Sequence, residues 1–220
     1  MNTLFRRLPS TIILALVAMP VVMSGQTAER SRTQGLKETN QFVKASETTS
    51  QAITNGKTEL QKTLTAYNTL VTQPSKDMKG DYKKLLKSSD SMNAKVADAK
   101  QKIEAMQKTG DTYFSGRAEA IKTIQDPALQ SQAQARLTAN QQEFAGVLES
   151  LRDAGGAFEP LRKQMADQIT FLGSDLTPSG MTSLKPQAEK LNTQGAEVFS
   201  KTDQALAKGN AYFQGLRTQS

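Results

Sequence analysis

Apolar residues recur at alternating spacings of four and three along the middle of the chain. The series covers more than six heptads without interruption, and only its serine, glycine and arginine are not apolar: Met78, Tyr82, Leu85, Ser89, Met92, Val96, Ala99, Ile103, Met106, Gly110, Tyr113, Arg117, Ala120 and Ile124. This spacing places the series on one face of a helix. The pattern therefore predicts a long helix that packs against other helices.

Three proline-containing turns divide the chain into four such segments. The predicted helices run from about Thr33 to Val71, from Met78 to Ile124, from Pro127 to about Leu172 and from Pro178 to Leu216. Alternating β-branched runs and Asn-Gly hairpin signals between apolar runs are missing from the sequence. The predicted fold is all-α, an antiparallel bundle of about four long, coiled-coil-like helices.

The turn residues also predict where the helices begin. Ser75 is the expected N-cap of the second helix, with Asp77 in its first turn, and Asp126 and Thr177 are the expected N-caps of the third and fourth. Proline follows both Asp126 and Thr177, and it is well tolerated at a first helical position because that N–H has no partner within the helix.

Two prolines fall inside predicted helices. Pro160 follows Gly155-Gly156, and the heptad phase continues through it, which favours a kinked third helix. A true break that gives five helices is the alternative. Pro186 predicts a bend early in the fourth helix.

The beginning of the chain is typical of a secretory signal peptide. Arg6 and Arg7 precede an uncharged apolar run, Thr11–Met23, and small residues follow it. We expect a signal peptide over residues 1–24 with cleavage near Ser24, a flexible segment over 25–35 and one helical domain over 36–217, exported to the periplasm or secreted. An uncleaved anchor is the alternative, although a membrane span needs about 20 apolar residues. Gly25 stands where a lipoprotein has its cysteine, so lipid attachment is not expected.

The composition excludes several kinds of chemistry. The chain has no cysteine and no histidine, so disulfides, thiolate metal sites and Ser-His-Asp or Cys-His catalysis are impossible. No enzyme activity, cofactor or metal site is predicted. The carboxylates Glu143, Glu149, Asp153 and Glu159 fall mostly outside the apolar phase of their helix and are interpreted as surface charges. Hydrophobic residues make up only 37%, which suits a slim bundle better than a thick core.

The densest positive cluster is the candidate binding site. It consists of five lysines near the start of the second helix: Lys76, Lys79, Lys83, Lys84 and Lys87. They could contact an anionic lipid or cell-wall polymer, but Asp77 and Asp81 dilute them, and a solvated helix face is the alternative. Nucleic acid is not expected, because the cluster contains no arginine and the predicted secretory signal argues against such a partner. Removal of residues 1–24 leaves a net charge of +5.

Two features of the apolar series have simple structural interpretations. Met78, Met92 and Met106 lie fourteen residues apart on one stripe, which indicates packing in the helix seam rather than an adaptable binding groove. Arg117 is the one charge in this series. We expect it to pair with a carboxylate of a facing helix or to mark a frayed part of the bundle.

Two stretches carry a family resemblance, Tyr113–Leu137 and Glu159–Leu191. The second contains Glu159-Pro160, then Asp167-Gln168, Phe171-Leu172 and Leu176. From about Leu36 to Phe213 the chain resembles a bacterial family of envelope proteins, domain of unknown function 2959. The resemblance implies a largely helical, secreted or envelope-attached protein and supplies no catalytic residues. Many members resemble lipoproteins with a cysteine at the end of the signal, and this chain departs from that pattern.

These observations predict a non-enzymatic helical scaffold or adaptor of the cell envelope. Its expected partner is another envelope protein or a second copy of the chain, and membrane contact would be peripheral. The alternative function is a binding module for an anionic surface through the Lys76–Lys87 region.

Overall fold

Four long helices form the whole of the described structure. The computed structural model describes the backbone of residues 23–218 and the side chains of residues 33–217. The helices are α1 (Met23–Thr72), α2 (Met78–Lys122), α3 (Pro127–Ser174) and α4 (Pro178–Thr218). The predicted all-α antiparallel bundle is confirmed. Residues 1–22, which hold nearly all of the predicted signal peptide, lie outside the described residues.

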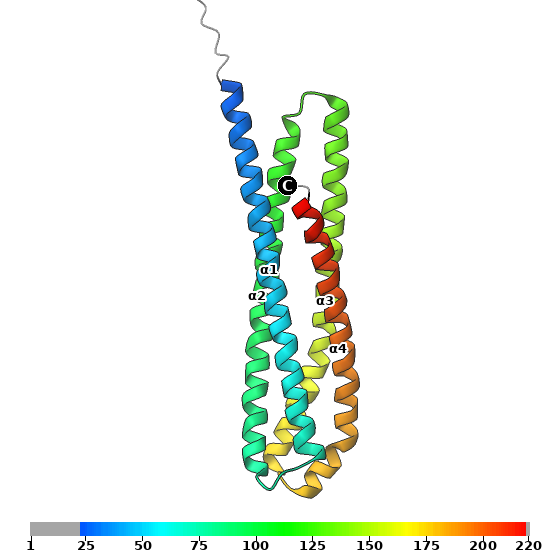
Figure 1. Ribbon diagram of the computed structural model, residues 1–220. Helices are drawn as coiled ribbons and strands as arrows, with labels where there is room; N and C mark the ends of the chain where they lie inside the picture. The colour runs from blue at the N-terminus through cyan, green and yellow to red at the C-terminus, as the bar shows by residue number, and fades with distance from the viewer. Residues whose placement is uncertain (1–22, 219–220) are drawn as a thin grey trace, which may run out of the picture.

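The helices run alternately up and down, and each packs against two neighbours (Figure 1). The loops over residues 73–77 and 175–177 lie together at one end, called here the two-loop end. The loop over residues 123–126 lies at the opposite, terminal end with the start of α1 and the end of α4. Packing is most extensive between α1 and α2 and least between α2 and α3. The hairpin of α2 and α3 extends past the end of α4.

All four helices carry the same three-and-four repeat on the faces that meet. It runs from Thr39 to Leu70 on α1, from Phe144 to Leu172 on α3 and from Met181 to Leu216 on α4. The α1 repeat is faint in the sequence because several of its members are hydroxyl residues. Their hydroxyl groups donate to backbone carbonyls, which satisfies them in the interface.

Two of those threonines connect α1 to α2. The hydroxyl of Thr49 lies 3.0 Å from the carbonyl oxygen of Lys102, and the hydroxyl of Thr63 lies 3.1 Å from that of Ser88. Each hydroxyl also reaches the carbonyl one turn earlier in its own helix. These small side chains let the two helices approach closely over a long interface.

The start of α1 differs from the prediction. The helix begins at Met23, about ten residues earlier than expected, and so includes residues 25–35, for which a flexible segment is predicted. This stretch is rich in Gln, Ala, Glu and Arg, which have good helix propensity, so the helix propagates beyond its apolar contacts.

Two of the three predicted caps are confirmed, and one is wrong. The Asp126 carboxylate accepts from the backbone N–H groups of Ala128 and Leu129, and the Thr177 hydroxyl accepts from that of Gly180. The N-cap of α2 is Asp77 rather than Ser75, because the Asp77 carboxylate accepts from the N–H of Gly80.

Neither internal proline interrupts its helix. The α3 helix is continuous through Pro160, as the heptad phase indicates, and the five-helix alternative is wrong. The α4 helix is likewise continuous through Pro186. Proline in a helix crowds the carbonyl four residues earlier. For Pro160 that residue is Gly156, which is solvent-exposed.

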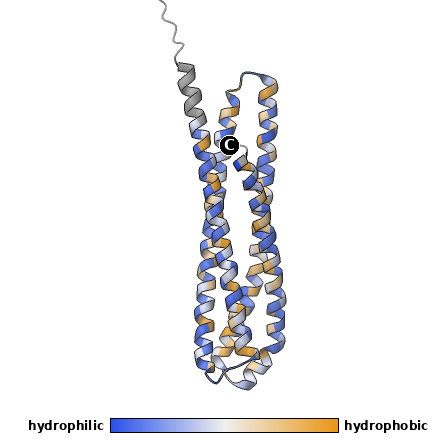
Figure 2. Cartoon of the chain, in the orientation of Figure 1, coloured by the Kyte–Doolittle hydropathy of each residue, from blue (hydrophilic) through white to orange (hydrophobic). Residues whose placement is uncertain are grey.

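The apolar core consists of two clusters. One fills the half of the bundle near the two-loop end and includes Tyr67, Leu85 and Met165. The other lies nearer the terminal end, where six aromatic rings from all four helices meet with centroids 4.9 to 6.4 Å apart: Phe42, Tyr113, Phe114, Phe144, Tyr212 and Phe213. Hydrophilic residues cover the outer faces along the length of the bundle (Figure 2).

The seam residues behave as core residues, with one correction. Met92 and Met106 are buried and Met78 is partly buried, which confirms seam packing. Among the residues that the structure describes, Arg117 has no carboxylate partner, contrary to the expected ion pair. Its guanidinium donates to the hydroxyl of Thr39 at 3.2 Å and lies 5.3 Å from the ring centre of Tyr113. The pairing differs because the facing residue of α1 is a threonine.

Candidate functional site

The five predicted lysines gather at the two-loop end. Lys76 lies in the loop before α2, and Lys79, Lys83, Lys84 and Lys87 lie in the first turns of that helix. All five are exposed. Lys79, Lys83 and Lys87 are spaced four apart and therefore share one stripe of the helix.

Only Lys84 among these five forms an ion pair with a described residue. Its ammonium group lies 2.9 Å from the carboxylate of Asp81, which also accepts from the hydroxyl of Ser75. The hydrogen bond from Ser75, and then that from Lys84, lowers the pKa of the Asp81 carboxyl. The Asp81 hydrogen bond raises the pKa of Lys84. Asp81 thus offsets one of the five positive charges, and Lys76 and the three lysines of the stripe carry the other four.

The carboxylates of α3 do not form a cluster. Glu143, Glu149 and Asp153 are exposed, and Glu159 is partly exposed. Glu159 accepts hydrogen bonds from Lys100 at 2.7 Å and from Arg162 at 3.0 Å, and these lower the pKa of its carboxyl. Within residues 33–217 no group of acidic side chains is arranged to hold a metal ion.

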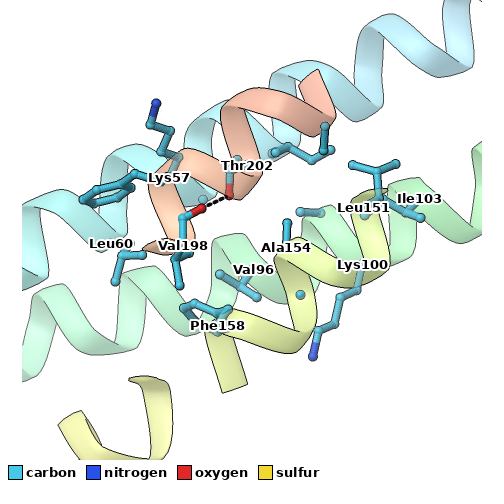
Figure 3. Close-up of a pocket in the computed structure, with 16 residues that line it drawn as sticks. Lys57, Leu60, Val96, Lys100, Ile103, Leu151, Ala154, Phe158, Val198 and Thr202 are labelled. Carbon is cyan, nitrogen blue, oxygen red and sulfur yellow. Dashed lines mark hydrogen bonds between the residues drawn. The ribbon is translucent and has the colours of Figure 1, made fainter. Parts of the chain in front are cut away.

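A cavity of about 90 Å³ lies between the two core clusters, and all four helices line it (Figure 3). Larger apolar residues bound it along the bundle axis. Leu60, Val96 and Phe158 lie toward the two-loop end, whereas Ile53, Ile103 and Leu151 lie toward the terminal end.

The cavity exists because small residues coincide. At this level the seam residue is Gly56 on α1, Ala99 on α2, Ala154 on α3 and Thr202 on α4. Elsewhere in the seams Leu, Met, Phe and Tyr alternate with small residues and fill the space.

Close helix packing does not require the glycines at the cavity. A methyl group on Gly56 would lie 3.7 Å from Val96, at ordinary van der Waals distance, and one on Gly155 would meet nothing within 4 Å. Gly195 differs, because a methyl group there would lie 2.6 Å from Leu64. Glycine inside a helix is about 1 kcal/mol less favourable than alanine. The cavity therefore persists at positions where larger residues would fit and would stabilise the fold.

The polar groups of the cavity are few. The Thr202 hydroxyl donates to the carbonyl of Val198 at 2.7 Å and is thus satisfied within its own helix. The amines of Lys57 and Lys100 point away from the cavity in opposite directions (Figure 3). Lys57 pairs with Asp203, and Lys100 pairs with Glu159. The interior is consequently apolar, with charge only at its margins.

The cavity cannot be predicted from the residue pattern of any one helix, although the small residues that form it are visible in the sequence. Each small residue is ordinary in a helix seam, and only the alignment of four helices places them at one level. A residue pattern along one helix cannot predict that alignment, because it depends on the loops and the relative shift of the helices.

Over the residues that the structure describes, none of the helices combines the length and apolarity needed to cross a membrane.

The family model described as "Protein of unknown function (DUF2959)" matches residues 28–216. No curated protein and no solved structure matches the chain. Since the match spans most of the 220 residues, the chain belongs to the DUF2959 family.

Proposed function

We propose that the protein is a non-enzymatic helical scaffold or adaptor of the bacterial cell envelope. The observation that carries this proposal is the rod-like bundle of four uninterrupted helices, 41 to 50 residues long, with hydrophilic outer faces. The 45-residue α2 alone spans about 68 Å at 1.5 Å per residue. A rod of this length can hold two partners apart or connect them. The export signal predicted over residues 1–24 supports an envelope location.

The terminal end offers a surface for a partner. Leu129, in the first turn of α3, is 57% exposed, and Leu36 on α1 is 49% exposed. The first turn of α3 belongs to the part of the α2–α3 hairpin that extends past the end of α4 (Figure 1). Exposed leucines are common singly, but here two lie where the bundle lacks its fourth helix. Either another envelope protein or a second copy of the chain could cover them.

In-cell photo-crosslinking tests this function. A photoreactive residue at position 129 is expected to give one defined adduct in the envelope fraction of the producing bacterium. The same photoreactive residue at the exposed position of Lys84, which lies at the two-loop end of the bundle, serves as the control. Recovery of the protein in the cytoplasm, or identical adduct patterns from both positions, would reject the scaffold proposal.

A second candidate is binding to an anionic surface through the two-loop end. The observation that favours it is the stripe of Lys79, Lys83 and Lys87, where no ion pair with a described residue reduces the positive charge. Each lysine near an anionic membrane contributes roughly 1 kcal/mol, so loss of three weakens binding by about 10²-fold.

Cosedimentation with vesicles tests this candidate. The protein is expected to bind vesicles of phosphatidylglycerol but not of phosphatidylcholine, and salt is expected to release it. Glutamine at Lys79, Lys83 and Lys87 should weaken binding by about 10²-fold. A control with glutamine at three exposed lysines outside the two-loop end should retain it: Lys44, Lys102 and Lys108. Equal loss in both triple variants would show that general charge, not the stripe, is responsible.

A further inference from the structure

We propose that the terminal end of the bundle binds an acidic amphipathic helix of a partner protein, which continues the path of α4. This inference rests on the proposed adaptor function and names the kind of partner that the terminal end would bind. The surface concerned is called here the terminal face. It consists of the sides of α1 and α3 that lie beyond the end of α4 and include Leu36 and Leu129.

The helix α4 ends before its neighbour α3 does. A Cβ at Gly209 of α4 would lie 3.6 Å from Val147 of α3, so these two residues lie at one level. From that level α4 continues for nine residues to Thr218, whereas α3 extends for twenty to Pro127. The first eleven residues of α3, about 16 Å or three turns, therefore lie beyond the end of α4, as Figure 1 shows.

Leu36 lies on the side of α1 that faces α4. It is three heptads before Lys57, which pairs with Asp203 of α4. The two helices are antiparallel, so the same register places Leu36 opposite a position about six residues past Thr218. Leu36 thus faces the path that a longer α4 would follow.

Leu129 lies on the corresponding side of α3. It is two heptads before Glu143, whose charge acts on Tyr212 of α4. By the register of Val147 with Gly209, Leu129 lies opposite a position about nine residues past the end of α4. The two leucines are therefore within about one turn of the same level, and they are the most exposed large apolar side chains of the described residues.

Arg117 of α2 supplies a positive charge beside the terminal face. Its guanidinium donates to the hydroxyl of Thr39, which is one turn along α1 from Leu36. The Nε–H group of Arg117 is buried and has no partner among the described residues. A buried donor without an acceptor is costly, and a carboxylate of a partner helix would satisfy it with a charge-assisted hydrogen bond.

The exposed charges of the terminal face are also basic. Lys37 and Lys44 line the same surface groove of α1 as Leu36, and Arg136 follows Leu129 by one heptad on α3. All three basic side chains are exposed, and no ion pair joins them to a described residue. These charges are complementary to an acidic helix that lies between α1 and α3.

The part of α1 that α4 covers shows the same complementarity. There Arg217 of α4 pairs with Glu47, and Asp203 pairs with Lys57. A partner helix on the same path would accordingly carry carboxylates opposite the lysines of the terminal face and an apolar side chain between the two leucines. A second copy of the chain is disfavoured, because a two-fold contact between two terminal faces would bring the same basic residues together.

The adduct from the photoreactive residue at position 129 tests the identity of the partner. Mass spectrometry is expected to find a segment of another protein with acidic and apolar residues at helical spacing. A segment of a second copy, a segment of this chain before Met23, or a partner segment without acidic residues would overturn the inference. Each of these results leaves the scaffold proposal standing, since that proposal fails instead on a cytoplasmic location or on identical adducts from both ends.

A helix-stapled peptide of about four turns tests the chemistry of the terminal face. The probe has leucines along one side and glutamates beside them, and the control peptide has lysine at the glutamate positions. Fluorescence anisotropy with the unmodified protein is expected to show binding of the acidic peptide that is about tenfold tighter or more. Equal affinities, or no binding of the acidic peptide, would overturn the inference.

Matched variants locate the binding site of the peptide, and circular dichroism confirms that each is folded. Leu129→Gln should weaken binding of the acidic peptide by about tenfold, whereas Leu86→Gln, at a leucine that is 37% exposed near the two-loop end, should not. Arg117→Gln should reduce the preference for the acidic peptide by about tenfold. Equal effects of the two leucine variants would overturn the site, and an unchanged preference in Arg117→Gln would overturn the role of Arg117.

Discussion

Gly110 allows α2 to approach the aromatic cluster, and its replacement by alanine tests whether that contact limits the packing. A Cβ at this position would lie 2.7 Å from Cε1 of Phe144 and 3.0 Å from Cε2 of Phe42. Phe42 and Phe144 are 0% and 4% exposed and pack edge to face with centroids 4.9 Å apart. Neither ring can yield without displacing other rings of the cluster.

The magnitude follows from two opposing effects. Alanine in place of glycine stabilises a helix interior by about 1 kcal/mol. Overpacking a close-packed core costs about 1–3 kcal/mol. Gly110→Ala should therefore lower the free energy of unfolding by about 0–2 kcal/mol.

Gly56→Ala is the matched control, because the same substitution at this seam position meets Val96 at 3.7 Å and causes no clash. It should raise the free energy of unfolding by about 1 kcal/mol. The helix propensity cancels between the two variants, so the difference of about 1–3 kcal/mol measures the clash alone. A change of 1 kcal/mol shifts Tm by about 2–4 °C in a domain of this size.

Urea denaturation followed by circular dichroism measures both variants. Gly110→Ala is expected to unfold at a lower urea concentration than the unmodified protein, and Gly56→Ala at a higher one. If Gly110→Ala proved as stabilising as Gly56→Ala, the close approach of α2 to the aromatic cluster would not be what requires glycine.

Three further outcomes are expected. Tyr67→Phe should destabilise the fold by about 1–3 kcal/mol, since the buried amide oxygen of Gln168 loses the donor of its hydrogen bond. Tyr212→Phe should cost little, because the buried hydroxyl of Tyr212 has no partner among the described residues. Urea denaturation compares the stabilities of the two variants. Burial raises the pKa of the Tyr67 and Tyr212 phenols above the ordinary value of 10.0. The stability that they contribute is therefore complete below pH 10 and declines as the pH rises further. Urea denaturation at a series of pH values above and below 10 detects this decline. Asp77→Ala should lower the free energy of unfolding by about 1 kcal/mol, and Ser75→Ala should lower it less, because Asp77 is the N-cap of α2. Thermal denaturation measures both variants, and a larger loss for Ser75→Ala would contradict the observed cap.

Much of the fold is readable in the sequence because each helix repeats its own pattern. The α2 series from Met78 to Ile124 predicts both the helix and its buried face, and Asp126-Pro127 predicts the start of α3. The α1 seam was harder to recognise, since Thr39, Ser46, Thr49 and Thr63 are polar in isolation. Their burial follows from hydrogen bonds to backbone carbonyls, which hydropathy does not express.

The location of the five-lysine site and the dilution of its charge by Asp81 are both predictable from the sequence, but the lysine that pairs with Asp81 is not. Its residues are close in sequence within one helix, so their exposure and common end follow from the helix alone. The Asp81 contacts that offset Lys84 depend on side-chain geometry in the first turn. The cap of α2 shows the same limit. Ser75 and Asp77 both suit the role, and the local backbone conformation decides between them.

Local periodicity along the chain therefore accounts for the four helices, their buried stripes and their turns, because each depends on residues within a few positions of one another. The cavity, the six-ring cluster and the contact of Arg117 with Thr39 instead depend on the relative axial positions of the helices. Those positions are set by packing between residues far apart in the sequence, such as Gly110 against Phe42 and Phe144. A repeat along one helix contains no information on that register, since a shift by one heptad leaves its pattern unchanged while it changes every partner.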